Sequence, residues 1–497
     1  MPVTLLGVDI GTTGCKVVAV DSEGWPLLSA YREYRLATPR PGWAELDPDE
    51  VWGAVCSAIR EVTAALPERP RALAVATLGE AVTPIDASGA ALAPTILSFD
   101  GRARACYEHL VGALGAARLT SVCGVEPQPH YSVAKWSWIA REMPETYRRA
   151  ATLACFGDLC AVRLGLPPVI DHTMATRTLA FDAAGGSWSP EVLDAAGLDI
   201  GKLPTPAPTG TVVGAVAARQ ARELGLADGA VLVTGGLDQV CAAYGAGIGA
   251  EDDGSAMLSL GTVAVLAAVL RADESGRNSV PTVPYRAPGE RLAIAGTPAG
   301  GAVLRWYRDR FGAAEAAAVA GAEDEFYDRI VAGAADVETD LIALPHFAGS
   351  RTAFADPQAT AALIGLTFAT ETRHIVRALL EGVALETAAM AGRLTESGAA
   401  VTSLRAVGGG SRSPVWMQIF ADVLEVPVES TASAEAAAVG AALIAGAATG
   451  VGAGDGRGLP LSRRYEPEES AGRGYRAKLT RYHDLHGALA AVRDAGR

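Results

Sequence analysis

The feature that most constrains this chain is a strand, a glycine–threonine turn and a second strand that occur twice. The first copy occupies residues 3–21, with its turn at residues 11–14. The second copy occupies residues 255–270, with its turn at Gly261 and Thr262. Apolar, β-branched runs that stop at glycines are typical of strands joined by tight turns. The repetition therefore predicts a duplicated core, with one such turn in each half.

The order of elements in the first half indicates a mixed sheet. Residues 27–35 predict a third strand, residues 47–66 a helix capped by the segment Asp47-Pro48-Asp49-Glu50, and residues 72–77 a buried strand. This order differs from the simple alternation of a dinucleotide-binding fold, and no GxGxxG follows the first strand. We therefore expect an α/β protein with two related mixed sheets.

The boundary between the halves is predicted within the glycine-rich segment 235–254. We expect an N-terminal domain at residues 1–246 and a C-terminal domain at residues 247–497, each long enough to bury its own core. Apolar positions at helical spacing predict a long helix at residues 370–394. The Ala/Gly-rich run 436–454 is interpreted as a closely packed helix rather than a linker.

Composition argues against several classes of protein. Hydrophobic residues make up 49% of the chain and charged residues 20%, with no apolar run long enough for a membrane span. The net charge of −14 disfavours binding to nucleic acid. The seven cysteines lack paired spacing, and no secretory signal is visible. We expect a cytoplasmic protein with reduced thiols that binds neither membranes nor nucleic acid.

The turn in the first half carries groups suited to phosphate. Asp9 precedes the turn, Gly11, Thr12 and Thr13 lie within it, and Lys16 follows it. Glycines let backbone N–H groups approach phosphate oxygens, threonine hydroxyls add donors, and a lysine offsets negative charge. A carboxylate at the strand end can hold Mg²⁺ directly or through water. A hairpin turn without a ligand is the alternative.

Two glycine turns in the second half predict a nucleotide site. Gly261 and Thr262 repeat the first turn, and residues 408–413 read Gly-Gly-Gly-Ser-Arg-Ser between an apolar strand and a helix expected to begin near Val415. Small residues there let the backbone lie flat against an adenine or ribose. A glycine loop without a ligand is again the alternative.

An acidic residue follows a third buried strand. Residues 231–237 form the strand, and Asp238 lies at its tip. Phosphoryl transfer to an alcohol depends on positioning and charge neutralisation, with one carboxylate accepting the proton of the hydroxyl. Asp238 is our candidate for this general base. The alternative is that Asp238 caps a helix starting near Val240.

These motifs together resemble those of the FGGY carbohydrate kinases, a family that includes glycerol kinases, xylulokinases and ribulokinases. Residues 9–16 resemble the first phosphate motif of the family, residues 259–262 its second, and residues 408–413 its adenosine motif. Residues 236–239 are similar to its catalytic-base segment, and residues 361–381 match its C-terminal signature. The resemblance spans nearly the whole chain.

The resemblance implies two ribonuclease-H-like domains of the actin type, with ATP and Mg²⁺ in an interdomain cleft that closes on a sugar or polyol substrate. By resemblance, Asp238 is the base and Asp9 lies by the metal. The residues implied to contact the nucleotide are Gly11, Thr12, Thr13, Lys16, Gly261, Thr262, Gly409, Gly410 and Ser413. A homodimer is also compatible with the resemblance.

Glu80, Asp100 and His130 are the candidates for contact with the acceptor. Glu80 aligns with a glutamate of glycerol kinases, and a lone carboxylate can accept two hydroxyls. Asp100 matches an acidic family position, with a surface pair to Arg102 as the alternative. His130 lies near a tyrosine position of glycerol kinases, with a satisfied buried histidine as the alternative.

The segment around Glu80 matches neither subfamily with which we compare it. Residues 76–82 contain neither the Gln-Met-His-Gly of xylulokinases nor the Gln-Arg-Glu-Thr of glycerol kinases. A second family signature is nearly met by residues 132–139, but His130 departs from the pattern. The acceptor is therefore open among ketoses, polyols and cyclitols.

Two other functions of the same fold stay open. One is an actin-like ATPase that uses nucleotide as a conformational switch, and the other is a non-catalytic sugar-binding regulator. Asp238 and the C-terminal signature argue against the first function. The joint presence of Asp9, Lys16, Asp238 and Thr262 argues against the second, because a binding protein has no need for a base.

Overall fold

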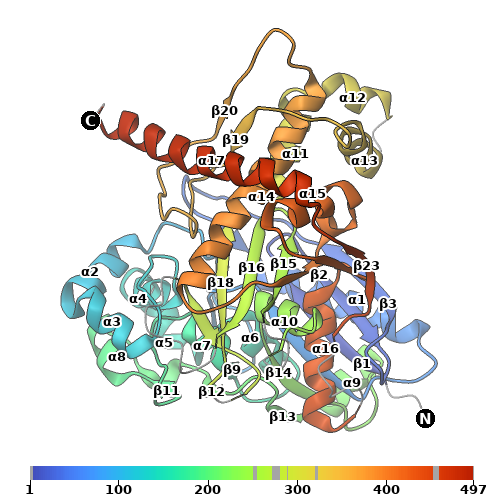
Figure 1. Cartoon of the computed structure of the whole chain (residues 1–497). Helices are drawn as coiled ribbons and strands as arrows, with labels where there is room; N and C mark the ends of the chain where they lie inside the picture. Colours follow the sequence, from blue (N-terminus) through green and yellow to red (C-terminus); the bar gives the residue numbers. More distant parts are fainter. Residues whose placement is uncertain are drawn as a thin grey trace. The chain divides into compact units, whose positions relative to one another are not determined.

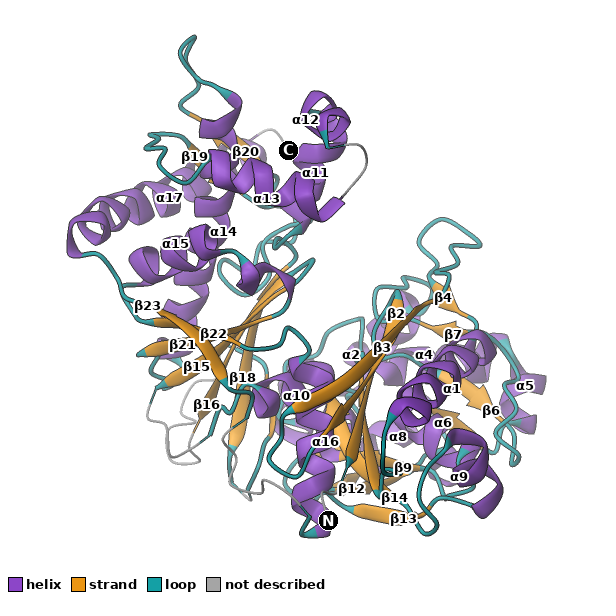
Figure 2. Cartoon of the chain, turned by 90° about the vertical axis from the view of Figure 1, so that its right-hand side faces the viewer, coloured by secondary structure: helices purple, strands orange, loops and turns teal. Residues whose placement is uncertain are grey.

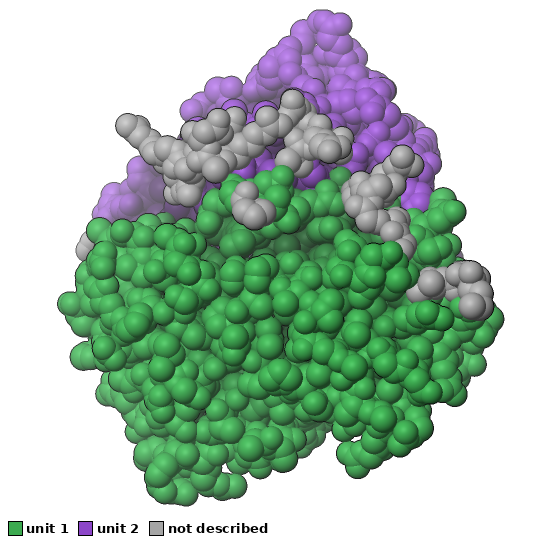
Figure 3. Space-filling view, turned by 90° about the horizontal axis from the view of Figure 1, so that it is seen from below, with its two compact units in different colours: residues 1–247, 281–291, 435–459 green, residues 248–280, 292–434, 460–497 purple. Residues whose placement is uncertain are grey.

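The computed structural model describes residues 4–249, 254–270, 280–287, 289–319, 323–451 and 458–495. Contacts group the chain into two compact units (Figure 3). Unit 1 comprises residues 1–247, 281–291 and 435–459, and unit 2 comprises residues 248–280, 292–434 and 460–497. Both units contain sheets and helices, so the α/β class is confirmed. No helix among the described residues is long and apolar enough to cross a membrane.

The main sheet of unit 1 has the strand order β13-β14-β5-β1-β2-β3. β1 is antiparallel to β2 and parallel to β5, and β5 is parallel to β14. These strands are β1 (Leu5–Ile10), β2 (Gly14–Val20), β3 (Pro26–Glu33), β5 (Ala72–Thr77), β13 (Val212–Ala215) and β14 (Val231–Leu237). The shorter strands are β4 (Glu45–Leu46), β6 (Thr83–Ile85), β7 (Thr95–Ile96), β8 (Thr152–Ala154), β9 (Val169–Asp171), β10 (Phe181–Asp182), β11 (Ser187–Trp188), β12 (Thr205–Ala207) and β17 (Thr282–Pro284).

Helices cover both faces of this sheet (Figure 2). α1 (Pro48–Ala65) packs on β2 and β3, and its N-terminus is capped as predicted, because the Asp47 side chain accepts from the backbone N–H of Asp49. α10 (Asp238–Gly245) and α16 (Ala436–Thr449) pack against each other and against the other face. The remaining helices are α2 (Arg104–Leu114), α3 (Ala116–Cys123), α4 (Ser132–Glu142), α5 (Pro144–Arg149), α6 (Phe156–Arg163), α7 (His172–Thr176), α8 (Pro190–Ala196), α9 (Ala218–Leu224) and the 3₁₀ turn η1 (Ile200–Lys202).

The position of α16 differs from the sequence-based division at residues 246 and 247. In Figure 1, α16 lies beside β1, although the two are close to opposite ends of the chain. Glycines also allow α16 to pack closely on α10: a Cβ on Gly440 would lie 1.8 Å from the carbonyl oxygen of Cys241 in α10. The described part of the run 436–454 is thus the closely packed helix that was predicted, and residues 452–454 lie outside the described residues.

The main sheet of unit 2 contains the strand order β18-β16-β15-β21-β22-β23. β15 is antiparallel to β16 and parallel to β21, and β21 is parallel to β22. This order matches β3-β2-β1-β5-β14-β13 strand for strand, so the predicted duplication is confirmed. The strands are β15 (Ser255–Leu260), β16 (Ala264–Leu270), β18 (Arg291–Thr297), β19 (Ile342–Leu344), β20 (Ala362–Ile364), β21 (Ser403–Val407), β22 (Val428–Thr431) and β23 (Leu461–Tyr465).

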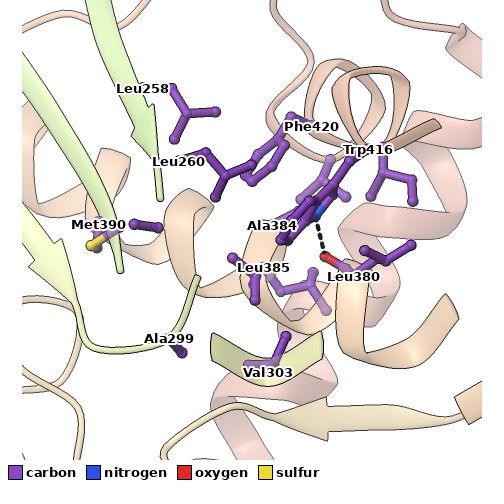
Figure 4. Close-up of a cluster of buried hydrophobic side chains, with 14 of the residues drawn as sticks. Leu258, Leu260, Ala299, Val303, Leu380, Ala384, Leu385, Met390, Trp416 and Phe420 are labelled. Atoms are coloured by element: carbon purple, nitrogen blue, oxygen red, sulfur yellow. Dashed lines mark hydrogen bonds between the residues drawn. The ribbon is translucent and has the colours of Figure 1, made fainter. Parts of the chain in front are cut away.

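The core of unit 2 lies between its sheet and α14 and α15. α14 covers the predicted long helix at residues 370–394 with slightly later bounds. Figure 4 shows Leu260 of β15, Leu380 of α14 and Phe420 of α15 in one cluster, and the indole Nε1 of Trp416 donates to the carbonyl oxygen of Leu380 at 3.1 Å. The helices are α11 (Ala302–Arg310), α12 (Ala313–Ala318), α13 (Glu323–Gly333), α14 (Thr372–Glu396), α15 (Pro414–Leu424), α17 (Glu469–Ala495) and the 3₁₀ turn η2 (Gly409–Arg412).

Candidate active site

Acidic residues lie at the carboxyl ends of three neighbouring parallel strands of unit 1. Asp9 lies near the end of β1, Glu80 follows β5, and Asp238 follows β14. β5 pairs with both β1 and β14, and Asp9 is in register with Ala76 of β5. The carboxyl ends of parallel strands meet at one edge of a sheet, where ligands of α/β proteins bind. The topology thus brings together three carboxylates predicted from separate segments.

A bulge at the end of β14 sets the position of Asp238. The pairing of β14 with β5 shifts register between Val233 and Gly236. A Cβ on Gly235 would lie 2.1 Å from the carbonyl oxygen of Val75, so this position requires glycine. A bulge re-aims the residues that follow it, and Asp238 becomes the first residue of α10. The alternative that Asp238 caps a helix starting near Val240 is therefore wrong, because the N-cap position is Leu237.

Both strand-end aspartates have pKa values near neutrality. Burial raises the pKa of Asp238 to about 6, with a smaller contribution from the nearby carboxylate of Glu80, while the backbone N–H of Gln239, which donates to Oδ1 at 2.7 Å, opposes the shift. Burial also raises the pKa of Asp9 to about 7, and Asp238 adds to that shift. A carboxylate with a pKa of this size is suited to accept a proton at neutral pH.

Glu80 forms a buried ion pair with Arg177, a residue that the sequence analysis missed. The Nε and Nη2 atoms of Arg177 both contact Oε1 of Glu80. The guanidinium carbon lies 5.0 Å from the ring centroid of Tyr131, and Nη2 lies 3.4 Å from Nε2 of His130. Lys135, fully buried in α4, donates from Nζ to the carbonyl oxygen of His130. We refer to Glu80, Arg177, His130 and Tyr131 as the Glu80 cluster.

Two features of the Glu80 cluster are relevant to its function. Glu80 has a left-handed backbone conformation, with φ of 60°, which few non-glycine residues adopt. Arg177 follows α7, directly after a run of buried residues in that helix. The feature that could have identified Arg177 as a functional residue is its position, as a charged residue, next to such a run. Arg177 contacts both Glu80 and His130, so these two predicted residues lie close together. Both are candidates for the same site.

Asp100 is occupied by neighbours of its own. Its carboxylate accepts from the backbone N–H of Ala44 at 2.6 Å and from Nε and Nη2 of Arg102 at 2.8 and 2.7 Å. The Arg102 guanidinium lies 3.6 Å from the ring centroid of Trp43, and its side chain is only 4% exposed. Asp100 and Arg102 thus form the pair of the alternative interpretation, but the pair is buried rather than on the surface. Both oxygens of Asp100 are used to hold the segment around Trp43 in place.

The phosphate-type turn of unit 1 is held rigidly. The N–H of Gly11 donates to the carbonyl oxygen of Gly14 at 3.0 Å, and the Tyr34 hydroxyl donates to the same oxygen at 2.9 Å. Within this turn Thr12 is half-buried and Thr13 is exposed. Lys16 pairs with Glu435 at the start of α16. Lys16 therefore already forms an ion pair with Glu435, a carboxylate that was not among the predicted site residues.

The predicted nucleotide residues of unit 2 line one cavity. Its volume is about 760 Å³, which lies within the range of small-molecule sites. The predicted residues that line it are Gly261, Thr262, Gly409, Gly410 and Ser413. The side chains of Leu304, Val331 and Trp416 supply apolar surface. The side chain of Ser413 caps α15, which begins at Pro414 rather than Val415.

The size and lining of this cavity fit a nucleotide. Gly409 and Gly410 line the cavity, and the close approach of Gly410 to Leu260 brings the backbone itself to the cavity wall. For magnesium, the described residues contain no group of three or more His, Cys, Asp or Glu side chains that could enclose a metal. Mg²⁺ commonly takes one or two protein carboxylates and completes its shell with water and phosphate oxygens, so Asp9 fits a magnesium ligand.

Comparisons with known proteins agree for both halves of the chain. Residues 4–245 match the N-terminal domain, and residues 256–449 the C-terminal domain, of the FGGY family of carbohydrate kinases. The gluconokinase of Bacillus subtilis is 28% identical over 88% of this chain and 86% of its own length. The glycerol kinase of Alkalilimnicola ehrlichii is 30% identical over 88% of each chain.

A solved structure extends this agreement to the fold. The xylulose kinase from Rhodospirillum rubrum superposes with a TM-score of 0.86 and 27% identity, covering 98% of this chain and 99% of the other. The matched residues include the strand ends of unit 1 and the cavity of unit 2. This chain therefore belongs to the FGGY family of carbohydrate kinases and is a phosphotransferase with an alcohol group as acceptor.

Proposed function

We propose that Asp238 is the general base in the transfer of a phosphoryl group from ATP to a hydroxyl of a sugar or polyol. The observation that supports this most is the position of Asp238 at the bulged end of β14, where burial raises its pKa to about 6. At neutral pH it is mostly a carboxylate and can accept the proton of an acceptor hydroxyl. A positioned base of this kind contributes about 10²–10⁴-fold to the rate.

Each unit, taken by itself, carries candidate contacts for ATP. The glycine-lined cavity of unit 2 binds the nucleoside, and Thr262 donates to phosphate oxygens. In unit 1, the side chains of Thr12, Thr13 and Lys16 provide further donors for phosphate, whereas the backbone N–H of Gly11 is already bonded within the turn. Asp9 holds Mg²⁺, and the bound Mg–ATP supplies the phosphoryl group together with a cation that offsets its charge.

The acceptor is assigned to the Glu80 cluster. Oε1 of Glu80 is bound by Arg177, which leaves Oε2 to accept from an acceptor hydroxyl. His130 lies on the same guanidinium and can contact a second hydroxyl. We do not include Asp100, because its two oxygens are occupied by Ala44 and Arg102. Glu80 and Asp238 lie close enough for the Glu80 carboxylate to raise the Asp238 pKa, which agrees with one acceptor site.

The proposal is tested by measuring ADP release from the purified protein with ATP and Mg²⁺ against polyols, ketoses, aldoses and cyclitols. We expect ADP release that depends on one class of acceptor and that Asp238→Asn abolishes. ADP release equal with and without every acceptor would indicate a nucleotide switch. Acceptor-dependent release that survives in Asp238→Asn would assign the base to another residue.

A further inference from the structure

We propose that Arg177 is a specificity-determining residue that positions Glu80 and makes the acceptor site select uncharged polyols or ketoses over sugar acids. This inference rests on the function proposed above and names the class of acceptor for the same site. The guanidinium of Arg177 contacts both Glu80 and His130.

Arg177 directs its binding edge at Glu80. Arginine recognises carboxylates through two parallel N–H groups, and the Nε–Nη2 edge is the fork that matches them. Both atoms of this edge contact Oε1 of Glu80. The remaining nitrogen of Arg177, Nη1, lies 3.5 Å from the hydroxyl of Tyr131. An acceptor carboxylate would therefore have to compete with Glu80 for the guanidinium.

The charges around Arg177 also disfavour an anionic acceptor. Glu80 has a side chain that is only 6% exposed, and Asp238 is close enough to perturb the pKa of Arg177. An acceptor carboxylate beside Arg177 would thus meet two protein carboxylates in a site of low dielectric constant, where repulsion between like charges is strong. An uncharged hydroxyl avoids this repulsion and can donate to the remaining oxygen of Glu80.

Packing fixes the geometry of the pair. The Tyr131 ring lies against the guanidinium, and Tyr131 is itself only 1% exposed. Glu80 itself holds a left-handed φ of 60°. Such strain is maintained where the surroundings determine one geometry, often at a functional site. Arg177 thus acts on the acceptor through Glu80, as a positioning residue.

The decisive variant is Glu80→Gln, because it frees the guanidinium. We measure kcat/KM by ADP release with an uncharged panel (glycerol, erythritol, ribitol and D-xylulose) and an aldonate panel (D-gluconate and D-xylonate). The wild-type protein should prefer its best uncharged acceptor to either aldonate by at least about tenfold. Glu80→Gln should reduce this preference by at least about tenfold, and the double variant Glu80→Gln/Arg177→Met should show no such gain for aldonates.

A second variant separates positioning from a merely structural role. Arg177→Met should raise the acceptor KM by about tenfold or more while the KM for ATP stays within about twofold. It should also move the acidic limb of the kcat/KM profile to higher pH, since the positive charge of Arg177 lowers the pKa of Asp238. Arg177→Lys, which keeps the charge, should leave that limb in place. The matched control is Arg118→Met, which removes an exposed arginine from its pair with Glu191.

The outcomes distinguish this inference from the proposed function. A wild-type preference for an aldonate, turnover of no uncharged acceptor, or an unchanged preference in Glu80→Gln would overturn the inference. If Arg177→Met does not fold, as shown by its melting transition, Glu80→Gln decides alone. Full turnover in Asp238→Asn would instead overturn the proposed base and leave the selectivity of the site as measured.

Discussion

Gly7 in the central strand β1 lies directly against Ala438 in α16. A Cβ on Gly7 would lie 1.7 Å from the carbonyl oxygen of Ala438, a backbone atom that no rotamer change can move. The contact joins the first strand of the chain to a helix near its end, and β1 carries Asp9. The close approach of β1 and α16 thus supports the strand end that holds a candidate metal ligand.

The first prediction concerns this contact. Gly7→Ala should destabilise the protein by about 1–3 kcal/mol or more, because overpacking at a backbone contact forces the sheet and helix apart. Gly53→Ala is the matched control: its Cβ would meet nothing within 4 Å on the exposed face of α1, and it should be neutral or slightly stabilising. Urea unfolding of the two variants measures the difference. Equal stabilities would show that the contact is looser than described.

The second prediction concerns the cavity of unit 2. In Gly410→Ala the new Cβ would lie 2.6 Å from the Leu260 side chain and 3.1 Å from its carbonyl oxygen, so the cavity wall must move. We expect the KM for ATP to rise by about tenfold with the acceptor KM unchanged, since binding of one substrate only is affected. Gly392→Ala in α14, where a Cβ meets nothing within 4 Å, is the control. An unchanged KM for ATP in Gly410→Ala would place the nucleotide elsewhere.

The third prediction is a pH dependence of activity. The base form of Asp238 is the carboxylate, and its pKa is raised to about 6. The acceptor kcat/KM should therefore be constant above about pH 7 and fall tenfold per pH unit well below pH 6. Initial rates in buffers of constant ionic strength give the profile. An acidic limb near pH 4, the range of an ordinary aspartate, would mean that burial does not perturb this carboxylate.

The fourth prediction links the same carboxylate to stability. The folded-state pKa of Asp238 is above the ordinary aspartate value of 3.8, so its favourable contribution to stability is complete below pH 3.8 and is lost as the pH rises through about 6. Asp238→Asn removes the cost of the buried charge and should be more stable than the wild type at pH 8, by roughly 1–3 kcal/mol. At pH 4 the difference should largely disappear. Melting temperatures at the two pH values measure it, and a variant that is less stable at pH 8 would contradict the assignment.

Much of the fold could be predicted because its signals are local. The strand–turn–strand pattern at residues 3–21 and 255–270 gave both hairpins and the duplicated sheet order. The nucleotide residues of unit 2 lie in short glycine motifs, and Gly261 and Gly410 line one cavity as a consequence. The helix at residues 47–66 was set by its cap at Asp47. In each case neighbouring residues along the chain carry the information.

The features that were missed depend on contacts between distant segments. Arg177 and Glu80 are 97 residues apart, and neither residue alone indicates the other. The Asp100 carboxylate accepts from the backbone N–H of Ala44, 56 residues away. The residues next to Asp100 in the sequence therefore give no indication of this structural role. Residues 435–459 likewise belong to unit 1 because of glycine contacts such as that of Gly440 with Cys241. A single boundary along the sequence cannot describe a unit made of separate segments.

The most direct test of the central claim is the turnover of Asp238→Asn at pH 7.5 with its best acceptor, measured together with the Kd for ATP. Removal of a general base should lower kcat by about 10²–10⁴-fold. The account predicts this loss with an unchanged melting transition or a higher one and a Kd for ATP within about twofold of the wild type. A kcat within about threefold of the wild type, in a folded variant that binds ATP, would contradict the assignment of Asp238 as the base.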